Sequence, residues 1–443
     1  MLFPSKIKCA THYIVFVALT LVFGMVIGII STMRGTDILG LALTAFFAFG
    51  VLVWFGFRGY SIRLQCLLWI AFTVRLALTL THTYIFPLPD SGADAITFER
   101  LGWQIAETWL IGDTSPPLKG AFLYSKVIGL LYYVFGRVPL IPQLVNVLLG
   151  TGIVLVVYKV VVLMTDSPKL GLMGGWVAAL FPTMNLYSAI LLRENTVILC
   201  SAFSFLCFMK WMQRGSKNGF LWAWVFLLLA TTLHGGMIVI GMAYVSIVLF
   251  YRPKAQQWSI SLSGVLLGVG FLGLVMVLIN VVGTNKLPSS MRLLLDPEYL
   301  GSRVSVSARD RAAYLVGLMP TTKWELVLQT PIRAFHFLYT PFVWNVSSAA
   351  DLLGLADAFM YLILSVYFVL GLKWLRENER AEYVLSLLFF FSLLVAFAWG
   401  TSNYGTAIRH RHKLAWLMIA VGAVGLEFRR DGCFHRKSIT NGS

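Results

Sequence analysis

The stretch "PLIPQLVNVLLGTGIVLVVYKVVVLM", residues 139–164, contains a single charged side chain, Lys159. A helix needs about 20 predominantly apolar residues to cross a bilayer, so this stretch is long enough to span one. Comparable runs recur along the chain and indicate a polytopic membrane protein. They predict about 12 spanning helices, at residues 12–33, 38–57, 64–86, 139–164, 170–186, 188–209, 219–234, 237–251, 259–282, 352–372, 383–399 and 414–428.

The overall composition points the same way. Of the 443 residues, 58% are hydrophobic and 12% are charged, and the mean hydropathy is +0.79. Soluble domains contain about 25% charged residues. We therefore expect an all-α polytopic membrane protein in which residues 1–443 form one transmembrane domain. The five cysteines have no ligand-like spacing, so neither a disulfide framework nor a metal site is expected.

The net charge of +16 is explained mainly by membrane topology. Lysine and arginine collect in cytoplasmic loops, and with a cytoplasmic N-terminus every short loop on that side is basic. We therefore expect both termini in the cytoplasm and no nucleic-acid partner. The polar clusters of the chain then fall on the outer face, in two long segments, residues 87–138 (candidate catalytic loop) and 283–351 (candidate lipid-phosphate-binding loop), and in short outer connections.

The first polar cluster is "FPLPDSGADAITFERLGWQ", residues 86–104. Its prolines end the preceding span, and Ser91 or Asp94 is expected to cap a new helix. Apolar residues then recur at three- and four-residue steps, which predicts an amphipathic helix at the outer interface. Asp90 and Asp94 would lie at or before its N-terminus, where the helix dipole keeps a carboxylate ionised. An ionised carboxylate can act as a general base.

The second cluster is "LFPTMNLYSAILLRENTVIL", residues 180–199. Arg193 and Glu194 lie near the outer start of a span, and charges at this depth are expected to face a cavity or a partner. Arg193 can bind phosphate as a planar fork, and Glu194 can orient an acceptor. A local structural ion pair is the alternative. Arg75, in the middle of the third span, is expected to form a buried structural pair, with a carboxylate of the first cluster as one candidate partner.

The third cluster comprises "GSRVSVSARDRAAYLVGLMP", residues 301–320, and "TPIRAFHFLYTPFVWN", residues 330–345. An outer loop has no topological reason to be basic, yet Arg303, Arg309, Arg311 and Arg333 lie here among aromatic residues. Guanidinium groups beside aromatic rings at headgroup level suit a lipid-linked phosphate. Contact with anionic headgroups, with the rings as an aromatic belt, is the alternative.

The fourth cluster is "WGTSNYGTAIRHRHK", residues 399–413. Arg409, His410 and Arg411 again place basic groups on the outer side, against the charge rule. An anionic ligand, most simply a phosphate or diphosphate, would explain this exception. His234, in "LHGGM", is a weaker candidate because one histidine beside two glycines can simply end a helix. The sequence has no glycine-rich loop for a nucleoside triphosphate and no serine-hydrolase elbow.

Two of these motifs resemble a known family. "PDSGADAITFERLGWQIA" (residues 89–106) and "FPTMNLYSAILLRENTVIL" (residues 181–199) are similar to parts of the GT-C class of membrane glycosyltransferases. That class includes bacterial relatives of protein mannosyltransferases and the lipid A aminoarabinose transferase. "RAFHFLYTPFVW" and "NYGTAIRHRHK" also resemble parts of bacterial envelope-polysaccharide proteins, O-antigen polymerases among them. The acidic segment follows the third span here, whereas in the GT-C class it usually follows the first.

The resemblance implies a GT-C-like fold in the bacterial inner membrane, with its active site on the periplasmic face. It implies transfer of a sugar from a polyprenyl-phosphate carrier to a lipid-linked or surface glycan acceptor, without a metal or other cofactor. Asp94 or Asp90 would be the base, Glu194 would orient the acceptor, and the arginines would bind the carrier phosphate. A polymerase acting on polyprenyl-diphosphate-linked repeat units and a flippase of an anionic lipid-linked glycan are the alternatives.

Overall fold

The computed structural model describes residues 58–114, 122–260, 311–318, 320 and 322–440, together with isolated positions at 37–51 and 262–273. The chain divides into two compact units, one formed by residues 1–155 and 179–195 and the other by residues 156–178 and 196–443. This differs from the single domain expected from the sequence. The division falls within and between apolar helices, so no change in composition marks it.

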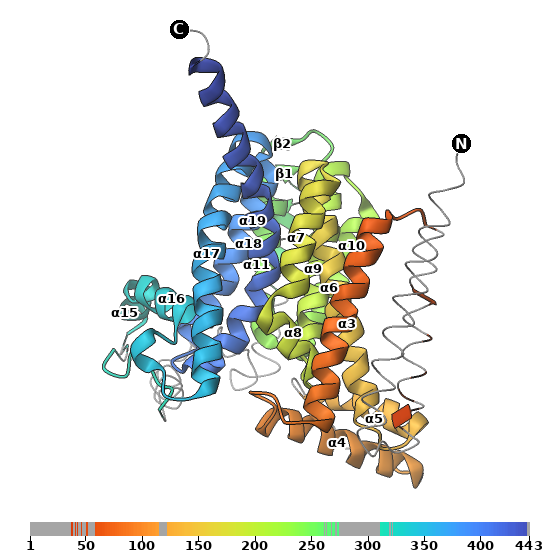
Figure 1. Ribbon diagram of the computed structural model, residues 1–443. Coiled ribbons are helices and arrows are strands. Elements are labelled where there is room, and N and C mark those ends of the chain that lie inside the picture. Colours follow the sequence, from red (N-terminus) through yellow and green to blue (C-terminus); the bar gives the residue numbers. More distant parts are fainter. Residues whose placement is uncertain are drawn as a thin grey trace, which may run out of the picture. The chain divides into compact units, whose positions relative to one another are not determined.

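The described residues are mostly helical, as expected for an all-α membrane protein (Figure 1). Five of their helices are long and apolar enough to cross a membrane, at Ile62–Tyr84, Leu140–Thr165, Glu194–Arg214, Asp351–Asn378 and Arg380–Trp399. Each overlaps a span predicted from the sequence. The prediction for residues 12–33 lies outside the described residues, and those for 38–57 and 259–282 lie largely outside them.

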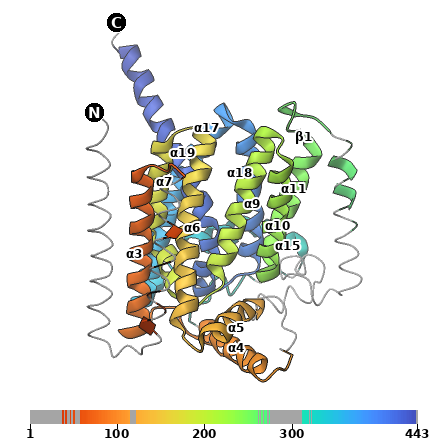
Figure 2. The same cartoon turned by 90° about the vertical axis from the view of Figure 1, so that its right-hand side faces the viewer.

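The first unit contains a long helix followed by two helices at one of its ends. α4 (Ala93–Leu110) and α5 (Leu123–Phe135) lie side by side and run across the end of α3 (Ile62–Tyr84) in Figures 1 and 2. α8 is a short helix that packs against α3. The elements of this unit are α3 (Ile62–Tyr84), α4 (Ala93–Leu110), α5 (Leu123–Phe135), α8 (Pro182–Ala189), the first part of α6 (Leu140–Thr165) and the last two residues of α7 (Pro168–Leu180).

The predicted span at residues 170–186 is interrupted in the structure. α7 ends at Leu180, and Phe181 takes an extended conformation (ψ 121°) before Pro182 opens α8. A residue that precedes proline is forced out of the helical region, which explains this break. The chain is again non-helical from residue 190 to 193, so the next span begins at Glu194 and not at residue 188 as predicted.

The second unit contains most of the long helices. Its elements are the rest of α6 and α7, α9 (Glu194–Arg214), α10 (Lys217–Leu233), η2 (Gly235–Ile238), α11 (Val239–Phe250), β1 (Tyr251–Arg252), β2 (Gln257–Trp258), α15 (Lys323–Leu328), α16 (Thr330–Tyr339), η4 (Val343–Asn345), α17 (Ala349–Asn378), α18 (Arg380–Trp399) and α19 (Tyr404–Thr440). β1 and β2 pair antiparallel as a short hairpin.

α17 and α19 pack along each other over much of their length (Figure 1). A Cβ atom at Gly371 would collide with the carbonyl oxygen of Val421, and one at Gly425 would collide with that of Tyr367. Glycine is therefore needed at this contact, as in membrane helices whose backbones approach closely. This packing fixes the position of α19, whose first turns carry the polar residues of the fourth cluster.

Candidate functional site

The first polar cluster forms α4, the amphipathic helix predicted from the sequence. Its N-cap is Gly92, not Ser91 or Asp94, and no side chain caps it. Asp94 lies exposed in the first turn, as predicted for a carboxylate at the positive helix end. Asp90 is exposed in the preceding turn with φ 62°, a left-handed conformation that aspartate adopts more readily than most residues.

Glu99, on the same helix, has a structural partner. Its carboxylate accepts hydrogen bonds from Arg137 Nε at 3.0 Å and Arg137 Nη2 at 3.1 Å, and from Tyr132 Oη at 3.3 Å. The hydrogen bond to Glu99 raises the pKa of Arg137. This pair ties α4 to the end of α5, so Glu99 is not a candidate for proton transfer.

The second cluster comes close to α4 within the first unit. The Arg193 guanidinium lies 6.0 Å from the centre of the Phe98 ring, within the range of a cation–π contact. Asp94 and Phe98 are four residues apart on α4 and share one helix face. The structure therefore places Arg193 beside Phe98, one helical turn along α4 from Asp94.

A buried network holds this arrangement in place. Phe98 packs edge-to-face on Tyr124, whose hydroxyl donates to Asn146 Oδ1 at 3.0 Å. Asn146 Nδ2 donates to the carbonyl oxygens of Ile190 and Leu192, both at 2.9 Å. These carbonyls belong to the non-helical residues before α9. The Ile190 carbonyl also accepts from the Leu192 amide at 2.8 Å, so Asn146 adds a second donor there and supplies a donor to the Leu192 carbonyl.

Arg75 belongs to the same network and is fully buried. Its Nε donates to Ser188 Oγ at 3.2 Å, and its Nη1 donates to the carbonyl oxygens of Ala71 and Ala179. A Cβ atom at Gly150 would collide with Ser188 Oγ, so glycine makes room for this contact. Arg75 is therefore buried, as predicted, with a hydroxyl and two carbonyls among its partners. Its pairing with a carboxylate stays a prediction.

We predict that Asn146→Ala lowers the free energy of unfolding by about 2–4 kcal/mol, because the Leu192 carbonyl loses this donor, the Ile190 carbonyl loses one of its two donors, and the Tyr124 hydroxyl loses its acceptor. Unfolding in mixed micelles would measure this, and hydrogen exchange should rise at residues 190–193. Gln143→Ala is the matched control one turn earlier on α6, because Gln143 accepts a single side-chain hydrogen bond, from Thr83 at 3.0 Å. Equal losses for the two variants would contradict the role assigned to Asn146.

The third and fourth clusters come together within the second unit. Ala313 and Asn403 form an antiparallel bridge, and Tyr314 Oη donates to the carbonyl oxygen of Thr401 at 2.9 Å. His410 joins the same group, with its Nδ1 at 3.4 Å from Thr401 Oγ1 and its ring 5.4 Å from that of His234. The weak candidate His234 thus lies beside the stronger candidate His410.

Of the two arginines of the third cluster that the structure describes, Arg311 is exposed and Arg333 is fully buried. Its Nε donates to Gln329 Oε1 at 3.1 Å, its Nη2 to the carbonyl oxygen of Leu318 at 2.6 Å, and its Nη1 lies 3.5 Å from Ser402 Oγ. Within the described part of the chain no carboxylate pairs with it. Burial lowers its pKa, which expresses the cost of holding this charge away from water.

Arg311 and Arg409 differ in their surroundings. Arg311 is exposed and forms an ion pair with Asp351 Oδ2 at 2.6 Å, which raises the pKa of the guanidinium. Tyr404 Oη donates to the other oxygen of Asp351 at 3.1 Å. Arg409 is half-buried near the start of α19. Arg303 and Arg309, also predicted to bind phosphate, lie outside the described residues.

Arg411 requires a correction. It was expected to bind phosphate, but it is fully buried and all five of its N–H donors are used. Nε and Nη2 donate to Asp357 Oδ2 at 2.9 and 2.6 Å, Nη1 donates to the carbonyls of Leu338 and Thr340, and Nη2 also donates to that of Gly354. No donor remains for a ligand, so Arg411 is structural. A lone aspartate in the apolar run of α17 was the sequence signal for this partner.

Comparisons with known proteins do not identify a family for this chain. No family model matches the sequence, and a search of curated proteins finds no significant match.

Proposed function

We propose that the protein is a membrane glycosyltransferase that moves a sugar from a polyprenyl-phosphate carrier to a lipid-linked or surface glycan acceptor. The observation that carries this proposal is the position of Arg193, 6.0 Å from the Phe98 ring on the helix face that also holds Asp94. A carboxylate and a guanidinium near one another are what such a transfer needs, because one takes a proton and the other binds a phosphate.

The reaction would be an inverting displacement. Asp94, or Asp90 in the preceding turn, accepts the proton of the acceptor hydroxyl as its oxygen bonds to the anomeric carbon of the sugar. The bond between that carbon and the phosphate oxygen breaks, and polyprenyl phosphate leaves with the electron pair. Arg193 stabilises the negative charge on the leaving phosphate, and Glu194, buried at the start of α9, orients the acceptor.

Buried amide oxygens support a hydroxyl-rich ligand in the first unit. Oδ1 of Asn185 and Oδ1 of Asn195 are buried and accept no hydrogen bond from the described residues. Each is an acceptor suited to a sugar hydroxyl. Asn185 lies in α8 and Asn195 in the first turn of α9, on either side of the non-helical residues 190–193. Non-helical backbone at membrane depth commonly lines a ligand cavity, which agrees with this assignment.

A second candidate function is a polymerase that acts on polyprenyl-diphosphate-linked repeat units. The observation that favours it is the buried Arg333, which has no carboxylate partner in the described part of the second unit. A buried cation of this kind suits a strongly anionic ligand. The same site would include His410, His234 and Arg409. Arg311 would contribute only those N–H donors that do not bond to Asp351.

The test is the identity of the lipid that accumulates without the protein. Polyprenyl-linked lipids from cells lacking it, and from the same cells carrying the wild-type chain, are compared by mass spectrometry. The leading proposal expects a polyprenyl-phosphate monosaccharide to accumulate and to disappear on complementation. Accumulation of single repeat units on diphosphate would favour the polymerase. Unchanged lipids would contradict both and would leave transport of an anionic lipid-linked glycan as the alternative.

The location follows from the same proposal. The chain is a membrane protein, and we propose that it lies in the bacterial inner membrane with both termini in the cytoplasm and the reaction on the periplasmic face. The basic loops predicted from the sequence support this orientation. Labelling of a cysteine introduced at Asp113, in the exposed turn after α4, by a reagent that cannot cross the inner membrane would test it.

A further inference from the structure

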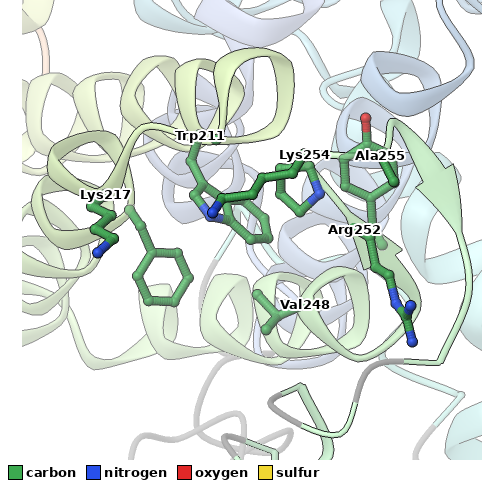
Figure 3. Close-up of a pocket in the computed structure, with 10 residues that line it drawn as sticks. Trp211, Lys217, Val248, Arg252, Lys254 and Ala255 are labelled. Carbon is green, nitrogen blue, oxygen red and sulfur yellow. The ribbon is translucent and has the colours of Figure 1, made fainter.

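A pocket of about 430 Å³ lies within the second unit, and none of the candidate residues discussed above lines it (Figure 3). It is formed by the end of α9, the start of α10, the end of α11 and the β1–β2 hairpin. Aromatic side chains and basic side chains share its lining: Trp211, Phe220 and Tyr251 in the first group, and Lys217, Arg252 and Lys254 in the second.

The charge of the pocket is of one sign. Three of its lining residues are basic and none is acidic. Lys217 and Lys254 are exposed, and no carboxylate in the described part of the chain forms an ion pair with either. Arg252 is anchored through a hydrogen bond of 2.7 Å from Nη2 to the carbonyl oxygen of Ile260. The pocket therefore presents two lysines with unused donors to an anion.

The hairpin that carries Lys254 is held firmly against the end of α9. Gln256 Nε2 donates to the carbonyl oxygens of Met212 at 2.8 Å and Gln213 at 3.2 Å, and Tyr251 Oη donates to Gln256 Oε1 at 2.9 Å. In Figure 3 the Lys254 side chain extends from the hairpin across the pocket toward Trp211. The hairpin is therefore fixed in position, and its turn directs the Lys254 ammonium group toward the Trp211 ring.

Tyr251 adds no negative charge to this site. Burial, together with Glu382 and Glu379, raises its pKa to about 12, so the phenol stays neutral at physiological pH. Glu382 itself is hydrogen-bonded to Gln213 at 2.8 Å. These two carboxylates are not among the residues that line the pocket.

The neighbouring surface favours a ligand with an apolar tail. Leu221 and Trp222 at the start of α10 and Phe250 at the end of α11 are all at least half exposed. On apolar helices of a membrane protein such side chains face acyl chains. A free phosphate would use the lysines alone, whereas a phospholipid would use both the lysines and this apolar surface.

We propose that this pocket binds the phosphate headgroup of an anionic phospholipid, with the acyl chains on the exposed apolar faces of α10 and α11. Aromatic rings at headgroup level and lysines beside them are typical of such sites. The lysines also lie on the side expected to be cytoplasmic, and the inner leaflet there carries anionic lipid. This inference is independent of the proposed glycosyl transfer.

The test is native mass spectrometry of the full-length, delipidated protein titrated with phosphatidylglycerol or with phosphatidylcholine. We expect preferential binding of phosphatidylglycerol, and a loss of about thirtyfold in its apparent affinity for Lys217→Gln/Lys254→Gln, because each basic residue near an anionic headgroup contributes about fivefold. The matched control is Lys169→Gln/Lys323→Gln, which removes two exposed lysines elsewhere and should bind as the wild type does.

Three results would overturn the proposal. These are equal binding of the two lipids, an unchanged affinity in the pocket variant, and displacement of phosphatidylglycerol by millimolar inorganic phosphate, which would indicate a site for free phosphate. Preferential binding of polyprenyl phosphate over phosphatidylglycerol would instead assign the pocket to the carrier lipid and would also contradict it. Lys217→Arg/Lys254→Arg keeps both charges and should restore binding, which separates loss of charge from loss of fold.

Discussion

Asp357→Ala should lower the free energy of unfolding of the protein by about 3–5 kcal/mol, the largest stability effect expected for a single side chain here. Asp357 is 1% exposed and Arg411 is fully buried. Removing the carboxylate leaves a guanidinium buried without its counter-charge. The three carbonyls that also accept from Arg411 cannot replace it, because they carry only partial charge.

The measurement is equilibrium unfolding of the purified full-length chain in mixed micelles with increasing denaturing detergent. Asp113→Ala is the control, since Asp113 is an exposed carboxylate whose only side-chain hydrogen bond in the described structure is to a neighbouring amide, and its loss should change stability by less than about 0.5 kcal/mol. A variant that unfolds like the wild type would show that Asp357 does not hold Arg411, and the prediction that Arg411 binds phosphate would return.

A double replacement distinguishes the free-energy cost of removing one charge of the pair from the contribution of the intact pair to stability. Asp357→Leu/Arg411→Met removes both charges and keeps most of the side-chain volume. Its free energy of unfolding should therefore be far closer to that of the wild type than the value for Asp357→Ala is. Arg411→Lys keeps the charge but loses the planar fork that reaches the carbonyls of Leu338, Thr340 and Gly354. It should therefore be destabilised although no charge is lost.

Much of the fold could be predicted because apolar length is a strong signal in membrane proteins. The spans at 64–86, 139–164, 352–372 and 383–399 match helices of the structure, and so does the amphipathic helix after residue 92. The helix boundaries around residues 181–193 could not be placed from apolar length alone. There Pro182 and the buried amide of Asn146 decide the backbone, and the hydrogen bond from Asn146 to Ile190 joins residues that are 44 positions apart in sequence.

The site was predictable to a smaller degree. A charge in the middle of an apolar span identified Arg75 correctly as a buried group, but the sequence does not say which guanidinium already has a partner. Asp357, 54 residues before Arg411, supplies that partner in one case. The role of an arginine depends on contacts that only the folded chain reveals, which is why Arg411 was predicted wrongly.

Under the proposed glycosyl transfer, Asp94→Asn should lower the rate by about 10²–10⁴-fold, the usual contribution of a general base. Asparagine has nearly the same shape but cannot accept the proton of the acceptor hydroxyl. Asp94 is exposed in the first turn of α4, where a lost charge costs at most about 1 kcal/mol of helix stability. The variant should therefore fold and reach the membrane, so a loss of rate reports on chemistry.

Two matched variants decide whether Asp94 is the base. Asp113→Asn removes an exposed carboxylate just beyond the other end of α4 and should keep full activity. Asp90→Asn also removes a charge, and asparagine tolerates the left-handed conformation of that turn as aspartate does. Turnover of the carrier lipid that accumulates in cells lacking the protein gives the rate for each variant. Loss of activity with Asp90→Asn alone would assign the base to Asp90. Full activity of both Asp94→Asn and Asp90→Asn would contradict general-base catalysis by this turn. That result would favour the polymerase, in which the arginines act without a carboxylate base.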